Sequence, residues 1–158
     1  MKKKIKWKPL LVCVAIPVLA GIVSGFLTRG GMGTFENLYK PPLAPPGWVF
    51  PVVWTVLFVL MGVASYLVLT ADAPQEQKSK ALKVYAAQLV FNFCWSIIFF
   101  NMRQYFFAFV WLVILWALIL AAAILFARVS KPAAYLMIPY LLWVTFAGYL
   151  NFAIYLLN

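Results

Sequence analysis

Residues 105–127 read YFFAFVWLVILWALILAAAILFA and contain no charged side chain. An α-helix needs about 20 predominantly apolar residues to cross the hydrocarbon core of a bilayer, and this stretch satisfies that requirement. It lacks the alternation of apolar and polar residues that is typical of a strand in a transmembrane β-barrel. The stretch therefore predicts a membrane-spanning helix.

Four further stretches have the same character, at about residues 9–28, 48–69, 82–100 and 135–157, and none of them contains an acidic residue. The 158-residue chain is 66% hydrophobic and 10% charged, whereas soluble domains are about half apolar and a quarter charged. We therefore predict an all-α integral membrane protein, a five-transmembrane-helix bundle that forms one domain over residues 1–158. The first stretch, which follows a lysine-rich segment, is alternatively a secretory signal, but its length favours a retained span.

The positive charges predict the orientation of the bundle. A cytoplasmic N-terminus places ten of the thirteen Lys and Arg residues on the cytoplasmic side: five within residues 2–8, three within residues 78–83, and Arg128 and Lys131. Only Arg29, Lys40 and Arg103 then lie on the other side. Cytoplasmic loops carry an excess of Lys and Arg, so we expect the N-terminus in the cytoplasm. The net charge of +10 is thus a signal of membrane topology, and nucleic acid is not an expected partner.

The residues that are missing exclude several classes of chemistry. The chain has no His, and its three acidic residues all lie outside the predicted spans. A His-ligated metal or haem site, a Ser-His-Asp triad and an intramembrane carboxylate for proton coupling are therefore not expected. Its two cysteines, Cys13 and Cys94, lie in apolar stretches and suggest neither a disulfide framework nor a metal site. We expect no metal, no obligatory cofactor and no residues for acid–base catalysis.

Polar and aromatic side chains recur at helical spacing in three predicted spans. Gln88, Asn92 and Ser96 repeat every four residues and share one face of their helix. Two other stripes consist of Trp54, Phe58, Met61 and Ser65, and of Tyr140, Trp143, Ala147 and Asn151. Amide side chains are unfavourable in lipid, so we expect these faces to point inward. They either join helices through hydrogen bonds or line an aromatic cavity that suits planar hydrophobic ligands.

Glycine and proline add two local predictions. Gly21 and Gly25 form a GxxxG pattern, which is typical of a close-packing helix face. The connection over residues 29–47 contains Pro41, Pro42, Pro45 and Pro46. Because proline fixes φ and stiffens a segment, this connection is either a rigid lid over the mouth of the cavity or only a rigid connector.

Four motifs together resemble one family of membrane proteins. They are KPPLAPPGWVFPVVWT at 40–55, MGVASY at 61–66, QLVFNFCWSIIFF at 88–100 and PYLLWVTFAGYLN at 139–151. In this order and spacing they resemble the TspO/MBR family, the translocator proteins and tryptophan-rich sensory proteins. The resemblance covers essentially the whole chain.

The resemblance implies a five-helix protein, often a homodimer, that binds porphyrins, sterols and synthetic aromatic ligands in a cavity closed by the first loop. We expect the protein to lie in the bacterial cytoplasmic membrane. Carried over by motif, the ligand-binding residues are Trp54, Phe58, Asn92, Trp95, Trp143 and Ala147. Phe35 stands where the family has its lid aromatics, and Asn151 joins the set from the third stripe.

We therefore expect a receptor or carrier for porphyrin-type tetrapyrroles, with a role in tetrapyrrole or stress regulation. Arg29 and Lys40 at the mouth of the cavity would pair with the carboxylates of the ligand. Because the chain lacks His, metal-free protoporphyrin IX is the expected ligand. The alternatives are a light-dependent porphyrin-degrading enzyme that uses Trp54 and Trp143, and a structural bundle without a ligand.

Overall fold

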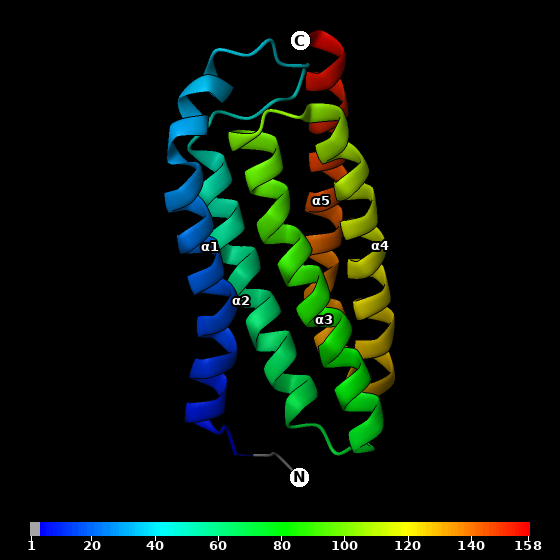
Figure 1. Cartoon of the computed structure of the whole chain (residues 1–158). Coiled ribbons are helices and arrows are strands. Elements are labelled where there is room, and N and C mark those ends of the chain that lie inside the picture. The colour runs from blue at the N-terminus through cyan, green and yellow to red at the C-terminus, as the bar shows by residue number, and fades with distance from the viewer. Residues whose placement is uncertain (1–3) are drawn as a thin grey trace.

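The computed structural model describes residues 4–158, which form an antiparallel bundle of five long α-helices (Figure 1). No strand occurs among these residues. Each helix is long and apolar enough to cross a membrane, which confirms the predicted all-α five-span architecture. The elements are α1 (Trp7–Glu36), α2 (Val49–Leu69), α3 (Gln75–Ser96), the π-helical turn η1 (Ile97–Asn101), α4 (Tyr105–Val129) and α5 (Lys131–Leu157).

The first helix is longer than the sequence indicates. Residues 29–36, expected in the first loop, continue α1, and the loop shortens to residues 37–48. Within this extension, Gly31 allows a close approach, because a Cβ atom there would collide with the backbone of Phe100 in η1. The helix backbone therefore lies directly against its neighbour. Similarly, α3 begins at Gln75, directly after Pro74, since proline suits the start of a helix.

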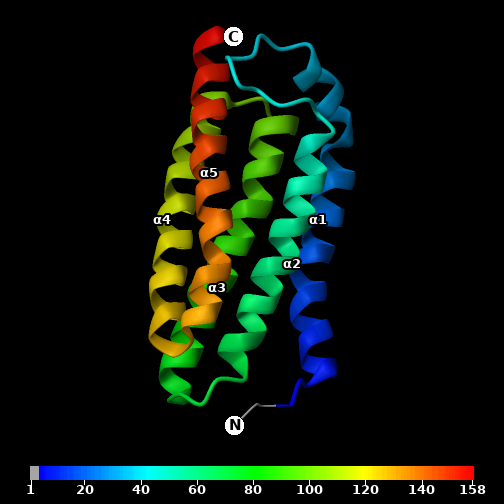
Figure 2. The same ribbon diagram turned by 180° about the vertical axis from the view of Figure 1, so that it is seen from behind.

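The helices pack mainly with their sequence neighbours, α1 with α2, α3 with α4 and α4 with α5, while α2 also packs against α5. The turn between α2 and α3 lies at one end of the bundle, with the start of α1 (Figure 2). The loop of residues 37–48 lies at the other end, beside the C-terminal end of α5 (Figures 1 and 2).

The basic residues are unequally divided between these two ends. The starts of α1, α3 and α5 and the end of α4 carry Lys8, Lys78, Lys80, Lys83, Arg128 and Lys131. Lys4 and Lys6 precede α1, whereas Lys2 and Lys3 lie outside the described residues. Arg29, Lys40 and Arg103 belong to the opposite end.

Glycines determine how closely α1 approaches α2. A Cβ atom at Gly62 would lie 2.6 Å from the Cα of Val14 and 2.8 Å from the carbonyl oxygen of Cys13, so the two backbones are in contact there. Gly21 faces the ring of Phe58, but a Cβ atom at Gly25 would meet nothing within 4 Å. The GxxxG pattern predicts close helix packing at both glycines. Within this chain that prediction is wrong for Gly25, because no neighbouring helix packs against it.

Candidate functional site

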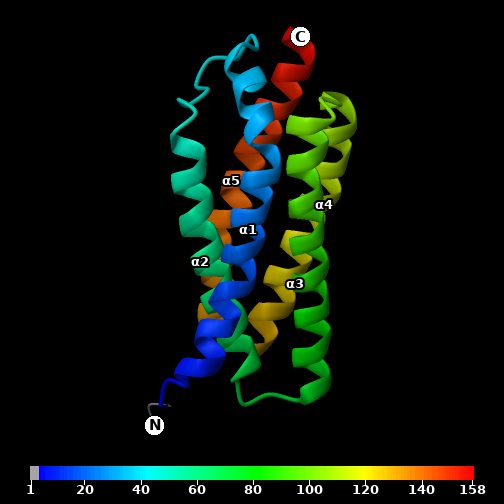
Figure 3. The ribbon, with the colours of Figure 1, turned by 60° about the vertical axis from the view of Figure 1, so that its left-hand side comes forward.

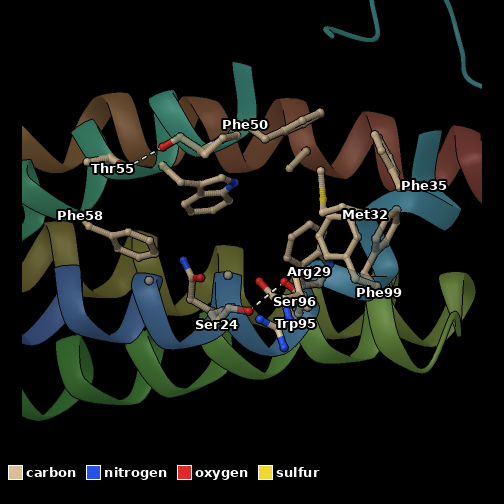
Figure 4. Close-up of a pocket in the computed structure, with 18 of the residues that line it drawn as sticks. Ser24, Arg29, Met32, Phe35, Phe50, Thr55, Phe58, Trp95, Ser96 and Phe99 are labelled. Carbon is tan, nitrogen blue, oxygen red and sulfur yellow. Dashed lines mark hydrogen bonds between the residues drawn. The ribbon is translucent and has the colours of Figure 1, made fainter. Parts of the chain in front are cut away.

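A cavity of about 680 Å³ occupies the half of the bundle nearest the loop of residues 37–48. Its walls come from α1, α2, α3 with η1, and α5, and none of the lining residues belongs to α4. The lining lies between Val18 and Phe35 on α1, Phe50 and Phe58 on α2, Asn92 and Phe100 on α3 and η1, and Trp143 and Ile154 on α5. Figure 4 shows these side chains converging on the open space.

The structure brings the predicted ligand-binding residues to this one cavity. Its lining includes all eight of them: Phe35, Trp54, Phe58, Asn92, Trp95, Trp143, Ala147 and Asn151. They come from four helices, and part of each predicted stripe faces this common space. The stripe members Gln88, Met61, Ser65 and Tyr140 are buried outside the lining. Their part in binding a ligand stays a prediction.

Aromatic rings form most of the wall. Trp54 stacks on Phe58 with 5.6 Å between ring centroids, and Trp95 stacks on Phe99 at 5.3 Å. Phe50 lies edge-on to Trp143 at 6.1 Å and to Phe35 at 5.5 Å. Rings held in contact by other rings keep their orientation, so the wall is preorganised for a flat apolar ligand.

Three further aromatic residues, Phe50, Phe99 and Phe100, also line the cavity. The sequence places Phe99 beside the polar stripe of Gln88, Asn92 and Ser96, but it does not single out Phe50 or Phe100. Phe50 is in the first turn of α2, next to the proline-rich loop. Phe99 and Phe100 belong to η1, and a π-helical turn displaces side chains from the regular helical period. All three lie within the quoted family motifs, which was the available signal.

The amide groups of the cavity also bond between helices. Asn92 donates from Nδ2 to the Tyr140 hydroxyl at 2.7 Å, and that hydroxyl donates to Oε1 of Gln88 at 2.6 Å. Asn151 accepts from the indole N–H of Trp95 at 3.0 Å and donates to the carbonyl oxygen of Tyr105 at 2.8 Å. Both interpretations of the polar stripes therefore hold, because Asn92 and Asn151 link helices and line the cavity at once.

One polar group of the cavity has no partner. The indole N–H of Trp143 is buried and makes no hydrogen bond within residues 4–158. A buried donor without an acceptor costs about 1–3 kcal/mol. The nitrogen atom has almost no accessible surface, so it does not face the open space of the cavity.

The two cations predicted at the mouth of the cavity differ in position. Arg29 lines the cavity, and its guanidinium carbon lies 4.1 Å above the centroid of the exposed Phe26 ring. Lys40 does not line it. Its Nζ donates to the carbonyl oxygen of Glu36 at 3.0 Å and lies 5.0 Å from the centroid of the Phe35 ring.

The predicted lid is tied to α5. Tyr149 donates from its hydroxyl to the carbonyl oxygen of Pro42 at 2.8 Å. The backbone N–H of Tyr39 donates to Oδ1 of Asn158 at 3.2 Å, and Nδ2 of Asn158 donates to the carbonyl oxygen of Tyr39 at 2.9 Å. Pro41, Pro42, Pro45 and Pro46 do not themselves line the cavity. The loop therefore bridges the ends of α1, α2 and α5 without forming the wall.

The lining of the cavity is mostly apolar and aromatic, with a few polar groups. No acidic side chain is in its lining, and residues 4–158 contain no cluster of three potential metal ligands. Aromatic faces, two interhelical amides and one guanidinium are the main groups of its wall.

Five membrane-length helices around an internal aromatic cavity define an α-helical membrane protein. Comparison with known proteins is more specific, because the sequence model of the TspO/MBR family matches residues 13–157. The chain belongs to this family and is an integral membrane protein.

Relatives from bacteria and animals match most of the chain. The tryptophan-rich protein TspO of Chlorobaculum tepidum is 40% identical over 94% of this chain and 95% of its own length. The translocator protein of Bos taurus is 36% identical over 92% of this chain and 88% of its own. The tryptophan-rich sensory protein of Cereibacter sphaeroides is 40% identical over 78% of this chain and 76% of its own.

Proposed function

We propose that this protein is a membrane receptor or carrier that binds porphyrin-type tetrapyrroles and other flat hydrophobic ligands, with a role in tetrapyrrole or stress regulation. The names of its relatives, translocator protein and tryptophan-rich sensory protein, support a receptor role. The observation that carries the proposal is the cavity of about 680 Å³ with stacked aromatic walls. That volume is within the range of about 300–1,000 Å³ for small-molecule sites.

Arg29 favours a ligand that carries a carboxylate. It is the one charged residue of the cavity lining, and within residues 4–158 its guanidinium interacts only with the Phe26 ring. A guanidinium binds a carboxylate through two parallel N–H···O bonds. The propionates of protoporphyrin IX match this group while the macrocycle matches the aromatic walls. Lys40, already bonded to the backbone, is the weaker candidate for this role.

The experiment compares protoporphyrin IX with its dimethyl ester, which has the same ring but no charge. Each is titrated into the purified protein, and quenching of Trp fluorescence gives the dissociation constant. Arg29→Gln should weaken binding of the acid by about 1.5–3 kcal/mol, the range for charged hydrogen bonds, and leave the ester unchanged. Arg103→Gln is the matched control, since Arg103 is exposed at the same end but does not line the cavity. The absence of saturable quenching by either compound would refute the proposal.

Light-dependent breakdown of bound porphyrin is a second candidate function, favoured by the three tryptophans in the lining, Trp54, Trp95 and Trp143. Illumination of the complex should then bleach the porphyrin absorbance faster than illumination of porphyrin in detergent alone. Trp54→Phe or Trp143→Phe should slow the bleaching and keep most of the affinity, because phenylalanine retains a ring but is harder to oxidise. Equal bleaching with and without protein would exclude this activity.

We further propose that the protein is a homodimer in the bacterial cytoplasmic membrane with its N-terminus in the cytoplasm. The unequal division of Lys and Arg between the two ends of the bundle supports this orientation. Family resemblance supports the dimer, and crosslinking in native membranes would test it.

A further inference from the structure

We propose that ligands reach the cavity sideways from the bilayer, through a lateral opening between α1 and α2. This inference rests on the proposed function, and it defines the ligand class more narrowly. The ligand would be an amphiphile already dissolved in the membrane, with a flat apolar body and an anionic group. The lateral opening is defined by five residues: Ile22, Gly25, Arg29, Pro51 and Thr55.

Exposure of the lining is confined to these two helices. Ile22, at 61% exposure, and the four other residues of the lateral opening are the exposed members of the lining, and all five belong to α1 or α2. Every lining residue on α3, η1 and α5 is buried or half-buried. The cavity therefore communicates with the outside of the bundle along one side.

The course of the two helices accounts for the lateral opening. At Gly62 the backbones of α1 and α2 are in contact, and at Gly21 α1 still meets the ring of Phe58. One turn further along α1, the position of a Cβ atom at Gly25 is open space. Figure 3 shows the two helices close together near the start of α1 and farther apart towards its end.

The surface around the lateral opening is suited to lipid rather than water. The outer face of α1 exposes Leu19, Val23 and Phe26, and that of α2 exposes Val52 and Val56. The hydroxyl of Thr55 at the edge is satisfied within its own helix, since it donates to the carbonyl oxygen of Pro51 at 2.7 Å. An apolar molecule can therefore pass this edge without losing hydrogen bonds to water.

Arg29 makes one end of the lateral opening cationic, whereas the other end is apolar. It follows the apolar residues Ile22 and Gly25 along the same face of α1, on the side of the loop of residues 37–48. A long cationic side chain near the end of a span extends towards the membrane interface. An amphiphile can thus keep its anionic group at Arg29 while its apolar body moves between the helices.

The other routes into the cavity are obstructed by contacts. The loop is joined to α5 through Tyr149 and Asn158. On the far side of α1, Gly31 lies against the backbone of Phe100, and Asn101 donates from Nδ2 to the carbonyl oxygen of Leu27 at 3.0 Å. Access along these routes requires breaking these contacts, whereas the lateral opening needs no such rearrangement.

The test uses the full-length protein in lipid nanodiscs and follows quenching of Trp fluorescence by protoporphyrin IX after rapid mixing. Gly25→Leu adds a side chain at the lateral opening. It should slow both association and dissociation by about tenfold, because narrowing the passage raises the barrier that the ligand crosses in both directions. Gly30→Leu is the matched control. Gly30 is exposed on the same helix, has open space at its Cβ position and does not line the cavity, so its rates should equal those of the wild type.

A second variant tests the route through the loop. Cysteines replace Pro42 and Tyr149 in a background with Cys13→Ser and Cys94→Ser, and a bis-maleimide joins them. The joined loop should leave the association rate unchanged. Blocked binding in the joined protein, or wild-type rates in Gly25→Leu, would overturn lateral access. Faster dissociation alone in Gly25→Leu would also overturn it, because this shows a lost ligand contact instead of a narrowed passage. If the wild type shows no saturable quenching at all, the proposed function itself fails.

Discussion

The seven tryptophans of this chain occupy three different environments. Trp54, Trp95 and Trp143 line the cavity. Trp111 and Trp116 join helices, since their indole N–H groups donate to the carbonyl oxygen of Phe91 at 2.9 Å and to the hydroxyl of Thr145 at 2.8 Å. Trp7 and Trp48 are exposed. The featureless sequence of α4 suggests a lipid-facing Trp111; this residue is half-exposed and also stacks on Phe91 at 4.4 Å.

Truncation of the cavity tryptophans should weaken ligand binding. Trp54→Ala and Trp143→Ala should each reduce porphyrin affinity by about 1–3 kcal/mol, as expected for loss of a large buried aromatic surface. Replacement by Phe should cost much less, since a ring remains. Fluorescence titration measures these losses, with the remaining tryptophans as reporters.

Trp7→Ala is the control for nonspecific partitioning, because Trp7 is 63% exposed and lies outside the cavity. It should bind porphyrin as the wild type does. Uniform weakening by all three Ala variants would show that porphyrin dissolves in the detergent or lipid around the protein instead of binding in the cavity.

At the scale of the helices, two glycines allow α1 to contact its neighbours closely, and others do not. Gly62 and Gly31 each lie against the backbone of another element, whereas Gly33 has open space at its Cβ position. Backbone atoms cannot move aside as a flexible side chain can. The position of a glycine within the fold, and not the GxxxG pattern, thus indicates whether it is needed for packing.

Gly62→Ala should destabilise the bundle by about 1–3 kcal/mol, the usual cost of overpacking, because the new methyl group meets Val14 and Cys13 of α1. Gly33→Ala should be neutral or slightly stabilising, since alanine favours a helix more than glycine does. Thermal unfolding in detergent, followed by circular dichroism, compares the two variants. Equal melting temperatures would mean that α1 and α2 can separate locally at no cost.

The loop of residues 37–48 is the element whose role depends most on its stiffness. Replacing Pro41, Pro42, Pro45 and Pro46 with Gly or Ser should leave the helices folded but weaken porphyrin binding by about 1–3 kcal/mol. The reason is that the loop connects Phe35 and Phe50 of the cavity wall, and a flexible loop loses more entropy when these residues are ordered. An unchanged dissociation constant would show that the loop is only a connector.

At the scale of the whole molecule, the charges predict which end faces the cytoplasm. In a variant without Cys13 and Cys94, Leu43→Cys should react with an impermeant maleimide added outside intact cells, since Leu43 is 81% exposed in the loop. Gln77→Cys, in an exposed position at the basic end, should react only after the cells are opened. The reverse labelling pattern would contradict the predicted orientation.

The fold class, the approximate spans and the facing of the polar stripes could be predicted from the sequence, because each depends on local properties. Apolar length specifies a membrane helix, and the helical period places Trp54 with Phe58, and Asn92 with Ser96, on one face. With the family motifs, the prediction covered eight ligand-binding residues, and all eight line one cavity in the structure. Each of these features depends on residues within a single segment of the chain.

Other features of the site depend on residues far apart in the sequence. Arg29 lines the cavity because α1 continues to Glu36, whereas Lys40 follows the end of this helix and does not line the cavity. The attachment of the loop to α5 needs Pro42 beside Tyr149, which are 107 residues apart. The lateral opening exists because α1 and α2 diverge beyond Gly21. Packing between distant segments sets these distances, and no local pattern of residues encodes them.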